Sequence, residues 1–254
     1  MEQKEIIRQI DDGANYYLRL LGDAPHMEYV DNGYYSIIRP MSGEKAISSV
    51  FNLRIDHLPT EELQQKVDEI KSLGLHTWWG LGLSERMLDA IWGNQRPQAP
   101  HDPADEESYM ALLLGDKPEY PSNDHVIKVK MVGSPEDFRV WAEMANNVLH
   151  GGYPIMHPTN HYHLCVSGKM ACYISYVEGM PAAVAAVMHN GEAATLEFVA
   201  TLKEYRRRGL ALAACRVAVE DAFDAGARII TLRALGLARK LYEVLRFRAY
   251  QPGL

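Results

Sequence analysis

The sequence LEFVATLKEYRRRGLAL occupies residues 196–212, and the second half of the chain is organised around it. Its first part, Leu196–Leu202, is an apolar run that predicts a strand. After the basic run, apolar side chains recur at helical spacing, at Leu212, Cys215, Val219 and Ala222. The predicted order is therefore a strand, a short loop and a helix.

Three arginines, residues 206–208, stand where this helix is expected to begin. The helix dipole places partial positive charge there, so each arginine should destabilise the helix by roughly 0.3–1 kcal/mol. No Ser, Thr, Asp or Asn stands at the expected N-cap, so the first N–H groups lack a side-chain partner. A bound anion removes both problems, because phosphate oxygens accept hydrogen bonds from backbone N–H and guanidinium groups. The alternative is a solvated basic turn.

The spacing of this loop is that of a known family. Arg206, Gly209 and Ala211 match the Q/R-x-x-G-x-G/A motif of the GNAT superfamily of acetyl-CoA-dependent N-acyltransferases, which the chain resembles over about residues 126–254. Residues 238–243, ARKLYE, are similar to the A-x-x-L-Y-E helix of that family. Phe247 is similar to the aromatic residue that opens its last strand.

The resemblance implies an α/β (α+β) fold, in which helices flank a mixed central sheet, and acetyl-CoA as cosubstrate without a metal. In this family the loop binds the pyrophosphate of coenzyme A, and the preceding strand contacts the pantetheine arm. The residues then expected to bind the cofactor are Val199, Ala200, Thr201, Arg206, Arg207, Arg208, Gly209, Leu210 and Ala211.

Two residues are candidates for the proton transfers of acyl transfer. Tyr242 matches the family's tyrosine, and its phenol stays protonated at neutral pH, so it can act as general acid toward the thiolate leaving group. Glu197 is expected on the same side of the strand as Val199 by the period-2 rule, where it can serve as general base for the amine. The alternatives are a half-buried helix aromatic for Tyr242 and a solvated or ion-paired strand residue for Glu197.

The sequence departs from the family pattern at two positions. Leu235 stands where many members carry an Asn, seven residues before the tyrosine, which removes a polar contact expected near the cofactor. Arg246 stands where a glycine usually precedes the phenylalanine. It either alters the turn into the last strand or adds a phosphate contact. Neither change lies in the pyrophosphate loop.

The first half repeats the order of elements that the second half shows. An initial helix is predicted at 3–21 and a strand at 34–38. The order strand, helix, strand, helix, strand then follows at 49–55, 60–71, 76–81, 84–91 and 107–114, and recurs at 194–201, 207–225, 228–233, 237–245 and 247–250. We interpret the first half as a degenerate GNAT-like repeat that helps to shape the substrate cleft, with an unrelated α/β domain as the alternative. Its loop at 56–61, DHLPTE, is acidic and is not expected to hold a pyrophosphate.

Composition then places the domain boundaries. Two prolines and several turn-forming residues make 115–124 the predicted linker. Residues 1–114 form the expected N-terminal domain and 125–254 the GNAT-like acetyltransferase domain. The latter is expected to begin with a strand at 126–132 and a helix from Pro135 to about Val148, and to carry a hairpin at Glu178-Gly179.

A histidine-rich loop occupies residues 149–164, with His150, His157, His161 and His163. No carboxylate or Cys-x-x-Cys accompanies them, so a metal site is not the expectation. In GNAT proteins this region commonly borders the acceptor site. We therefore expect a mobile or ligand-facing loop in which His161 or His163 contacts substrate, with surface histidines as the alternative.

Charge and composition exclude several classes of partner. The 254 residues carry a net charge of -7, which argues against nucleic acid or an anionic membrane as partner. No P-loop motif is present and no apolar run is long enough to span a bilayer. Three cysteines, an odd number, make a disulfide framework improbable and fit a cytoplasmic protein.

The predicted function is transfer of an acetyl or other short acyl group from acetyl-CoA to an amine, by direct attack in a ternary complex. The alternative is a non-catalytic module that binds or senses acyl-CoA. No motif specifies the acceptor, which can be the amine of a small molecule or of a peptide.

Overall fold

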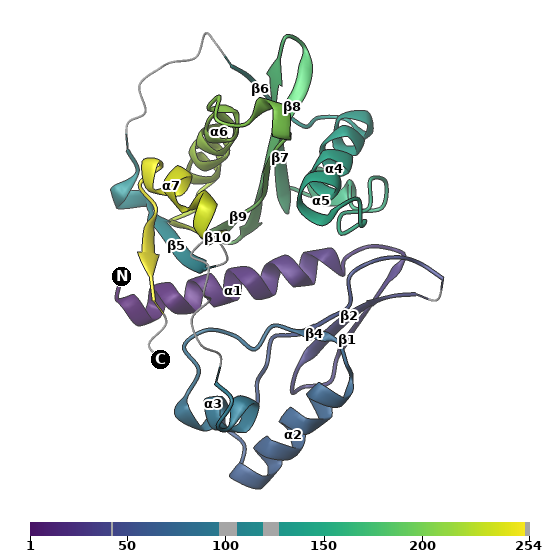
Figure 1. Ribbon diagram of the computed structural model, residues 1–254, viewed down its shortest axis with the longest axis vertical. Helices are drawn as coiled ribbons and strands as arrows, with labels where there is room; N and C mark the ends of the chain where they lie inside the picture. The colour runs from purple at the N-terminus through teal and green to yellow at the C-terminus, as the bar shows by residue number, and fades with distance from the viewer. Residues whose placement is uncertain (42, 97–105, 119–126, 252–254) are drawn as a thin grey trace.

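Two β-sheets form the framework of the chain, and a long N-terminal helix lies between them (Figure 1). The computed structural model describes residues 1–41, 43–96, 106–118 and 127–251. The Pro-, Asn- and Gln-rich composition of 92–105 predicts a loop there; residues 97–105 of it and most of the predicted linker at 115–124 lie outside the described residues.

The larger sheet has seven strands in the order β11-β5-β10-β9-β8-β7-β6. These strands are β5 (Glu107–Leu113), β6 (Lys128–Met131), β7 (Met170–Val177), β8 (Met180–Asn190), β9 (Ala193–Thr201), β10 (Ile229–Leu235) and β11 (Arg248–Tyr250). β9 and β10 run parallel, whereas the other neighbours run antiparallel. The mixed sheet confirms the predicted fold class.

Helices cover both faces of this sheet (Figure 1). α4 (Pro135–His150) and the short α5 (His163–Val166) pack on one face, and α6 (Leu210–Asp224) and α7 (Gly236–Val244) pack on the other. β8 lies between β9 and β7, and seven of its consecutive residues are buried, Ala182–Met188. Its small alanines let α4 approach, so that the Trp141 indole donates to the carbonyl oxygen of Ala185 at 3.0 Å.

Local sequence signals explain how these elements begin and turn. Ser134 caps α4 by accepting a hydrogen bond from the Asp137 N–H at 3.1 Å, as the sequence predicts. Glu178 and Gly179 both have positive φ, 50° and 82°. A two-residue turn with positive φ at both positions matches the twist of the strands it joins, which confirms the predicted hairpin.

The smaller sheet belongs to the first half. Its strands, in spatial order, are β1 (Met27–Asp31), β2 (Ser36–Pro40), β3 (Ser49–Phe51) and β4 (His76–Thr77), accompanied by α2 (Thr60–Ser72) and α3 (Glu85–Trp92). The strand β1 was not predicted. The strand predicted at 76–81 is only two residues long, because a loop follows in which Gly80 and Gly82 adopt positive φ.

The two halves share a topology. In the order β1-β2-β3-β4 the pairs are antiparallel, antiparallel and parallel, and α2 connects the parallel pair. In the order β7-β8-β9-β10 the pairs follow the same pattern, and α6 connects the parallel pair. Each set is preceded by a long helix, α1 or α4. This correspondence supports the tandem arrangement.

One strand of the first half lies in the larger sheet. β5 pairs with β10 along its whole length and with β11 at residues 109–111. The first half therefore contributes a strand between β10 and the C-terminal strand. The division of the chain at 115–124 remains a prediction.

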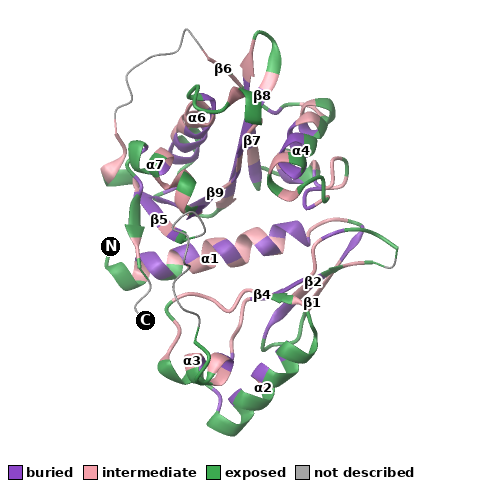
Figure 2. Cartoon of the chain, in the orientation of Figure 1, coloured by how far each residue is buried: buried purple, intermediate pink, exposed green. Residues whose placement is uncertain are grey.

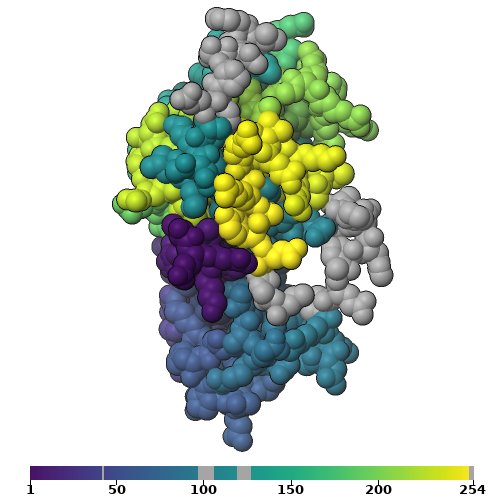
Figure 3. Space-filling model, turned by 90° about the vertical axis from the view of Figure 1, so that its left-hand side faces the viewer, coloured from purple at the N-terminus to yellow at the C-terminus, as the bar shows by residue number. Residues whose placement is uncertain are grey.

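The helix α1 (Gln3–Leu21) packs against both sheets (Figures 1 and 2). Gly13 lies where α1 crosses β9 and β10, and a Cβ at this position would meet the Thr231 Oγ1 at 2.7 Å. The helix therefore approaches the strands closely because Gly13 has no side chain. The two ends of the chain also meet, since Gln3 donates to the carbonyl oxygen of Gln251 at 3.4 Å (Figure 3).

Candidate active site

The two parallel strands separate where the predicted site residues lie. β9 and β10 pair from Ala193 with Ile229 to Thr195 with Thr231, and the pairing then stops. β9 continues to Thr201 while it stays paired with β8 on its other edge. The backbone of residues 197–201 is therefore not paired with β10 and can hydrogen-bond a ligand that enters between the strands.

A β-bulge interrupts β9 at this point. Phe198 has φ of 53°, and the register with β8 shifts there. The bulge reverses the alternation of side chains. Val199 therefore packs with Leu196 on the α6 side of the sheet, whereas Glu197 lies with Thr195 on the α1 side. The prediction that Glu197 and Val199 share a side is wrong for this reason.

The first turn of α6 has no side-chain cap. Its N-cap residue is Gly209, with φ of 78°, as the absence of Ser, Thr, Asp and Asn predicts. Arg207, two residues earlier, also adopts a left-handed φ of 62°. For a residue other than glycine this conformation is strained by roughly 1–3 kcal/mol, and such strain clusters at ligand-binding loops. The turn thus presents unsatisfied N–H groups on a strained backbone.

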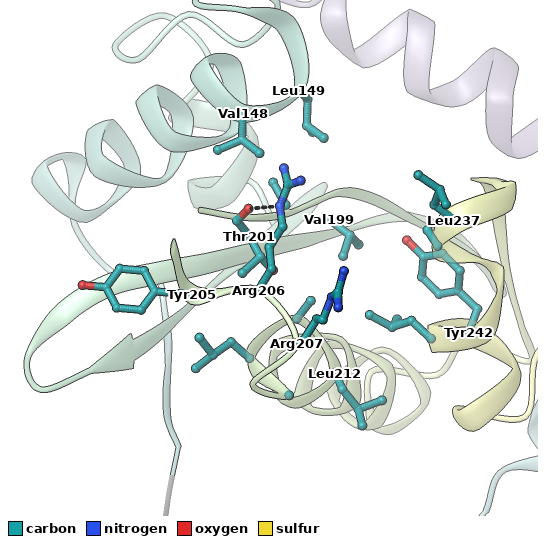
Figure 4. A pocket seen from close by; sticks show the side chains of 16 residues that line it. Val148, Leu149, Val199, Thr201, Tyr205, Arg206, Arg207, Leu212, Leu237 and Tyr242 are labelled. Atoms are coloured by element: carbon teal, nitrogen blue, oxygen red, sulfur yellow. Dashed lines mark hydrogen bonds between the residues drawn. The ribbon is translucent and has the colours of Figure 1, made fainter. Parts of the chain in front are cut away.

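The three arginines of the turn point in different directions. Arg206 donates through Nε to the carbonyl oxygen of Thr201 at 3.2 Å, and both Arg206 and Arg207 line a pocket (Figure 4). Arg208 lies over the Tyr205 ring, 5.5 Å from its centroid, and does not line that pocket.

The pocket has a volume of about 460 Å³ and is bounded by this turn, the end of β9 and α7 (Figure 4). Its lining residues are Val148, Leu149, Val199, Ala200, Thr201, Tyr205, Arg206, Arg207, Gly209, Leu210, Ala211, Leu212, Leu237, Ala238, Leu241 and Tyr242. The pocket brings together every residue predicted to bind the cofactor except Arg208. Two cations in an otherwise largely apolar lining suit a ligand with a phosphate group and a long neutral arm.

Tyr242 lies at one end of the pocket, and Arg206 and Arg207 lie between it and Tyr205 (Figure 4). Its side chain comes from α7 and is 6% exposed, and its ring packs edge-on against Phe247. Burial, together with the nearby Cys215 and Glu197, raises the pKa of Tyr242 well above its usual value. The phenol therefore stays protonated across the physiological range.

Glu197 lies on the other side of the separated strands, in a cluster of polar side chains. Thr195 donates through Oγ1 to its carboxylate at 3.2 Å. Burial raises the pKa of Glu197, and attraction to Arg233 and the hydrogen bond from Thr195 oppose that rise only in part. The carboxylate is thus more basic than an exposed glutamate.

Arg233, on β10, is the cation of this cluster. Burial lowers the pKa of Arg233, but attraction to Glu197 and Glu107 outweighs it and leaves the pKa above its usual value. Arg233 is not among the site residues that the sequence predicts. The available signal was a single charge in the otherwise apolar strand at 229–235, IITLRAL, apart from one Thr.

The histidine-rich loop is mainly structural. His161 is 1% exposed, accepts a hydrogen bond from the His157 N–H at 2.8 Å and contacts the Leu21 carbonyl oxygen at 3.0 Å. The expectation that His161 contacts substrate is therefore wrong, because both ring nitrogens are bonded to the backbone. His163 is exposed, with Nδ1 2.9 Å from the Asn160 carbonyl oxygen. In the described part of the chain, no group of His, Cys, Asp and Glu is arranged to hold a metal ion.

Both departures from the family pattern lie beside the site. Leu235 is the N-cap residue of α7 and is 60% exposed. Arg246 has φ of 70°, the left-handed region that favours glycine, which explains why a glycine is usual there. Arg246 lines a separate cavity with Asp116, Phe247 and Arg248 and is not among the residues that line the pocket beside α6.

Comparisons with known proteins agree with this geometry. Residues 139–247 match the family model of the acetyltransferase (GNAT) family. No curated protein matches the chain. Among the described residues, no helix has the length and apolar character needed to cross a membrane.

Solved structures of GNAT proteins are also similar to this chain. A GCN5-related N-acetyltransferase from Kribbella flavida matches with a TM-score of 0.58 and 16% identity, over 95% of this chain and 96% of that one. A GNAT-family protein from Novosphingobium aromaticivorans matches with 0.43 and 22%, over 57% and 61% of the two chains. The first likeness shows that the fold of both halves together recurs elsewhere. Residues 139–247 match the acetyltransferase (GNAT) family, and the fold of the chain is that of a GNAT protein.

Proposed function

We propose that this protein transfers an acetyl or other short acyl group from acetyl-CoA to an amine. The observation that carries the proposal is the uncapped first turn of α6, which faces a pocket that also contains Arg206, Arg207 and Tyr242. The pocket combines anion-binding groups, apolar side chains and a protonated phenol. These groups match the pyrophosphate, the pantetheine arm and the sulfur of coenzyme A.

The substrate acetyl-CoA fits the groups that the chain provides. The N–H groups of the α6 turn and the two guanidinium groups bind the pyrophosphate. Val199, Ala200 and Thr201 lie beyond the point where β9 and β10 separate, so their backbone can pair with the pantetheine amides as a neighbouring strand would. A backbone N–H from the same segment can polarise the thioester carbonyl.

The reaction forms one C–N bond and breaks one C–S bond. Glu197, directly or through a water, removes a proton from the ammonium of the acceptor, and the free amine attacks the thioester carbonyl carbon. The tetrahedral intermediate collapses with loss of the coenzyme A thiolate, while Tyr242 donates a hydrogen bond to the sulfur. The second proton of the attacking nitrogen passes to the sulfur through the phenol, so Tyr242 ends protonated and coenzyme A leaves as the thiol. The balance is one ammonium and one thioester giving one amide, one thiol and one proton.

Tyr242 acts during C–S cleavage and not after it. A phenol is a weaker acid than a thiol, so transfer of its proton to a free thiolate is unfavourable by about 1.5 pK units even without burial. A hydrogen bond from Tyr242 to the developing charge on sulfur therefore supplies most of the stabilisation. The raised pKa keeps the donor proton in place.

Release of free thiol from acetyl-CoA over a panel of small-molecule and peptide amines tests the proposal, with acetyl-CoA binding measured by calorimetry on the same sample. Amine-dependent thiol release supports the enzyme. Binding without turnover across the whole panel favours the non-catalytic acyl-CoA-binding module instead. Absence of binding contradicts both.

A further inference from the structure

Polar groups from three elements meet where β9 and β10 separate, on the α1 side of the sheet. They are Glu197 of β9, Arg233 of β10 and Tyr17 of α1, and each is partly exposed to solvent. The Arg233 guanidinium lies 5.7 Å from the centroid of the Tyr17 ring, and Glu197 accepts a hydrogen bond from Thr195 of the same strand, where β9 and β10 still pair. Glu197 also raises the pKa of Tyr242, so the two proposed proton-transfer groups lie within electrostatic range of each other.

Aromatic rings hold the Arg233 side chain in place, but its buried Nε–H has no hydrogen-bond acceptor among the described residues. Its guanidinium lies over the Trp78 ring, 4.8 Å from the centroid, and over the Tyr17 ring at 5.7 Å. Trp78 is itself fixed, because its indole N–H donates to Asp11 at 2.8 Å. The two aromatic faces orient the plane of the guanidinium, but they do not accept hydrogen bonds from its edge. The Arg233 Nε is buried and has no hydrogen-bond partner.

Glu197 does not accept a hydrogen bond from Arg233 either. The two side chains attract each other, which affects the pKa of both, but they form no direct ion pair. The hydrogen bond that Glu197 accepts comes from Thr195. A buried donor without a partner destabilises a fold, and such groups are rare in native proteins. A guanidinium with a buried, unpartnered Nε therefore lies near a carboxylate for which Thr195 is the hydrogen-bond donor, an arrangement that suits a ligand carrying both an anion and an amine.

We propose that Arg233 binds an anionic group, a carboxylate or a phosphate, that the acceptor amine carries in addition to its amino group. A guanidinium edge matches the oxygens of either group. Glu197 faces the amino group while Arg233 holds the anion, so the acceptor is oriented with its amine toward the thioester. The inference rests on the proposed function, because it names the class of acceptor for the same site.

The first half of the chain contributes to this site. Tyr17 belongs to α1, and Trp78 follows β4 in the first half, so the guanidinium of Arg233 is oriented by residues outside the matched acetyltransferase domain. The first half is thereby assigned a part in acceptor selection although its own loop at 56–61 lacks arginines.

Matched pairs of amines test the proposal: butylamine with 4-aminobutyrate, and ethanolamine with phosphoethanolamine. For the wild type we expect the anionic member of at least one pair to have the higher kcat/KM and to raise the melting temperature. Arg233→Met should lower kcat/KM for that member at least roughly tenfold and leave its neutral partner within about twofold. Arg233→Lys keeps the positive charge but lacks the two parallel N–H donors of the guanidinium, so its kcat/KM for the anionic amine should lie between those of the wild type and Arg233→Met. Arg248→Met, an exposed arginine of the same sheet, is the matched control.

Equal losses for both members of a pair would mean that Arg233 only supports the fold, and would overturn the proposal. So would a wild type that prefers the neutral members. If no amine is acetylated, the proposed enzymatic function is contradicted, but the melting-temperature measurements still test whether Arg233 binds an anion. Stabilisation by 4-aminobutyrate or phosphoethanolamine that Arg233→Met abolishes supports it, and absence of stabilisation by both contradicts it.

Discussion

Arg206 donates a hydrogen bond through Nε to the carbonyl oxygen of Thr201, 3.2 Å away. The bond joins the turn before α6 to the last residue of β9, so the two parts of the proposed coenzyme site are held at a fixed separation. The terminal nitrogens of Arg206 remain available at the pocket (Figure 4).

Replacement of either pocket arginine should weaken coenzyme A binding. A charge-assisted hydrogen bond contributes about 1.5–3 kcal/mol, so Arg206→Ala and Arg207→Ala should each raise the Kd roughly tenfold or more by calorimetry. Arg208→Ala is the matched comparison, since Arg208 lies over Tyr205 outside the pocket. A loss at Arg208 as large as at Arg206 would contradict the assignment of the pocket.

Tyr242→Phe should separate catalysis from binding. The substitution keeps the ring that packs on Phe247 and removes only the hydroxyl, so the Kd for acetyl-CoA should stay within about twofold. Loss of a general acid lowers kcat by roughly 10²–10⁴-fold. Because the pKa of Tyr242 is raised, the wild type should show no loss of activity from this residue up to at least pH 9. Unchanged kcat in the variant would remove Tyr242 from the mechanism.

The acid limb of the pH–rate profile should belong to Glu197. A general base must be deprotonated, so kcat/KM rises as pH passes its pKa, which burial raises above 4.5. Glu197→Gln should abolish this limb. Thr195→Val removes a hydrogen bond that lowers the pKa, so the limb should move to higher pH. If neither substitution changes the acid limb of the pH–rate profile, another residue is the general base.

His161 should make the folded state sensitive to acid. Burial lowers the pKa of His161 to about 4 from 6.5. Above pH 6.5 the side chain is neutral in both states, but between 6.5 and 4 the unfolded chain binds a proton that the folded chain does not. Stability is therefore lost as pH falls through this window, by about 1.4 kcal/mol at pH 5.5.

Denaturant unfolding at pH 8 and pH 5.5 measures this effect. His161→Gln should remove about that much of the difference between the two pH values, although it lowers stability at both. His163→Gln, an exposed histidine of the same loop, should leave the difference in place. The same pH dependence in His161→Gln and the wild type would show that other groups cause it.

Sequence patterns predicted the elements of the second half well because their signals are local. Ser134 is an N-cap, Glu178-Gly179 is a turn, and residues 206–211 carry a family motif. The failures depend on long-range contacts. The bulge at Phe198 places Glu197 and Val199 on opposite sides of the sheet, and no residue in the strand predicts this bulge.

The proposed acceptor site could not be predicted for the same reason. The proposed role of Arg233 depends on its contacts with Trp78 and Tyr17, which are more than a hundred residues away in the sequence. These contacts form only because α1 packs on the separated strands. Likewise, nothing in β5 indicates that it pairs with β10 instead of with a strand of its own half. Local patterns specify elements, and tertiary packing decides which elements meet.

Gly13→Ala should be destabilising although it improves helix propensity. In an exposed helix the change stabilises by about 1 kcal/mol, since glycine is a poor helix former. Here the new Cβ would meet the Thr231 Oγ1 at 2.7 Å, so α1 must move away from β9 and β10. Overpacking of this kind costs about 1–3 kcal/mol, and the free energy of unfolding should fall accordingly.

A double-mutant cycle locates the cause. Thr231→Ala removes the atom that the new methyl group meets, so Gly13→Ala should be much less destabilising in a Thr231→Ala background than in the wild type. Gly133→Ala is the matched control, because its Cβ would enter open space. If Gly13→Ala behaves like Gly133→Ala, α1 does not pack closely on the split strands. Tyr17, one turn further along α1, would then be too far from Arg233 to orient it, and the role of the first half in acceptor selection would lose its structural basis.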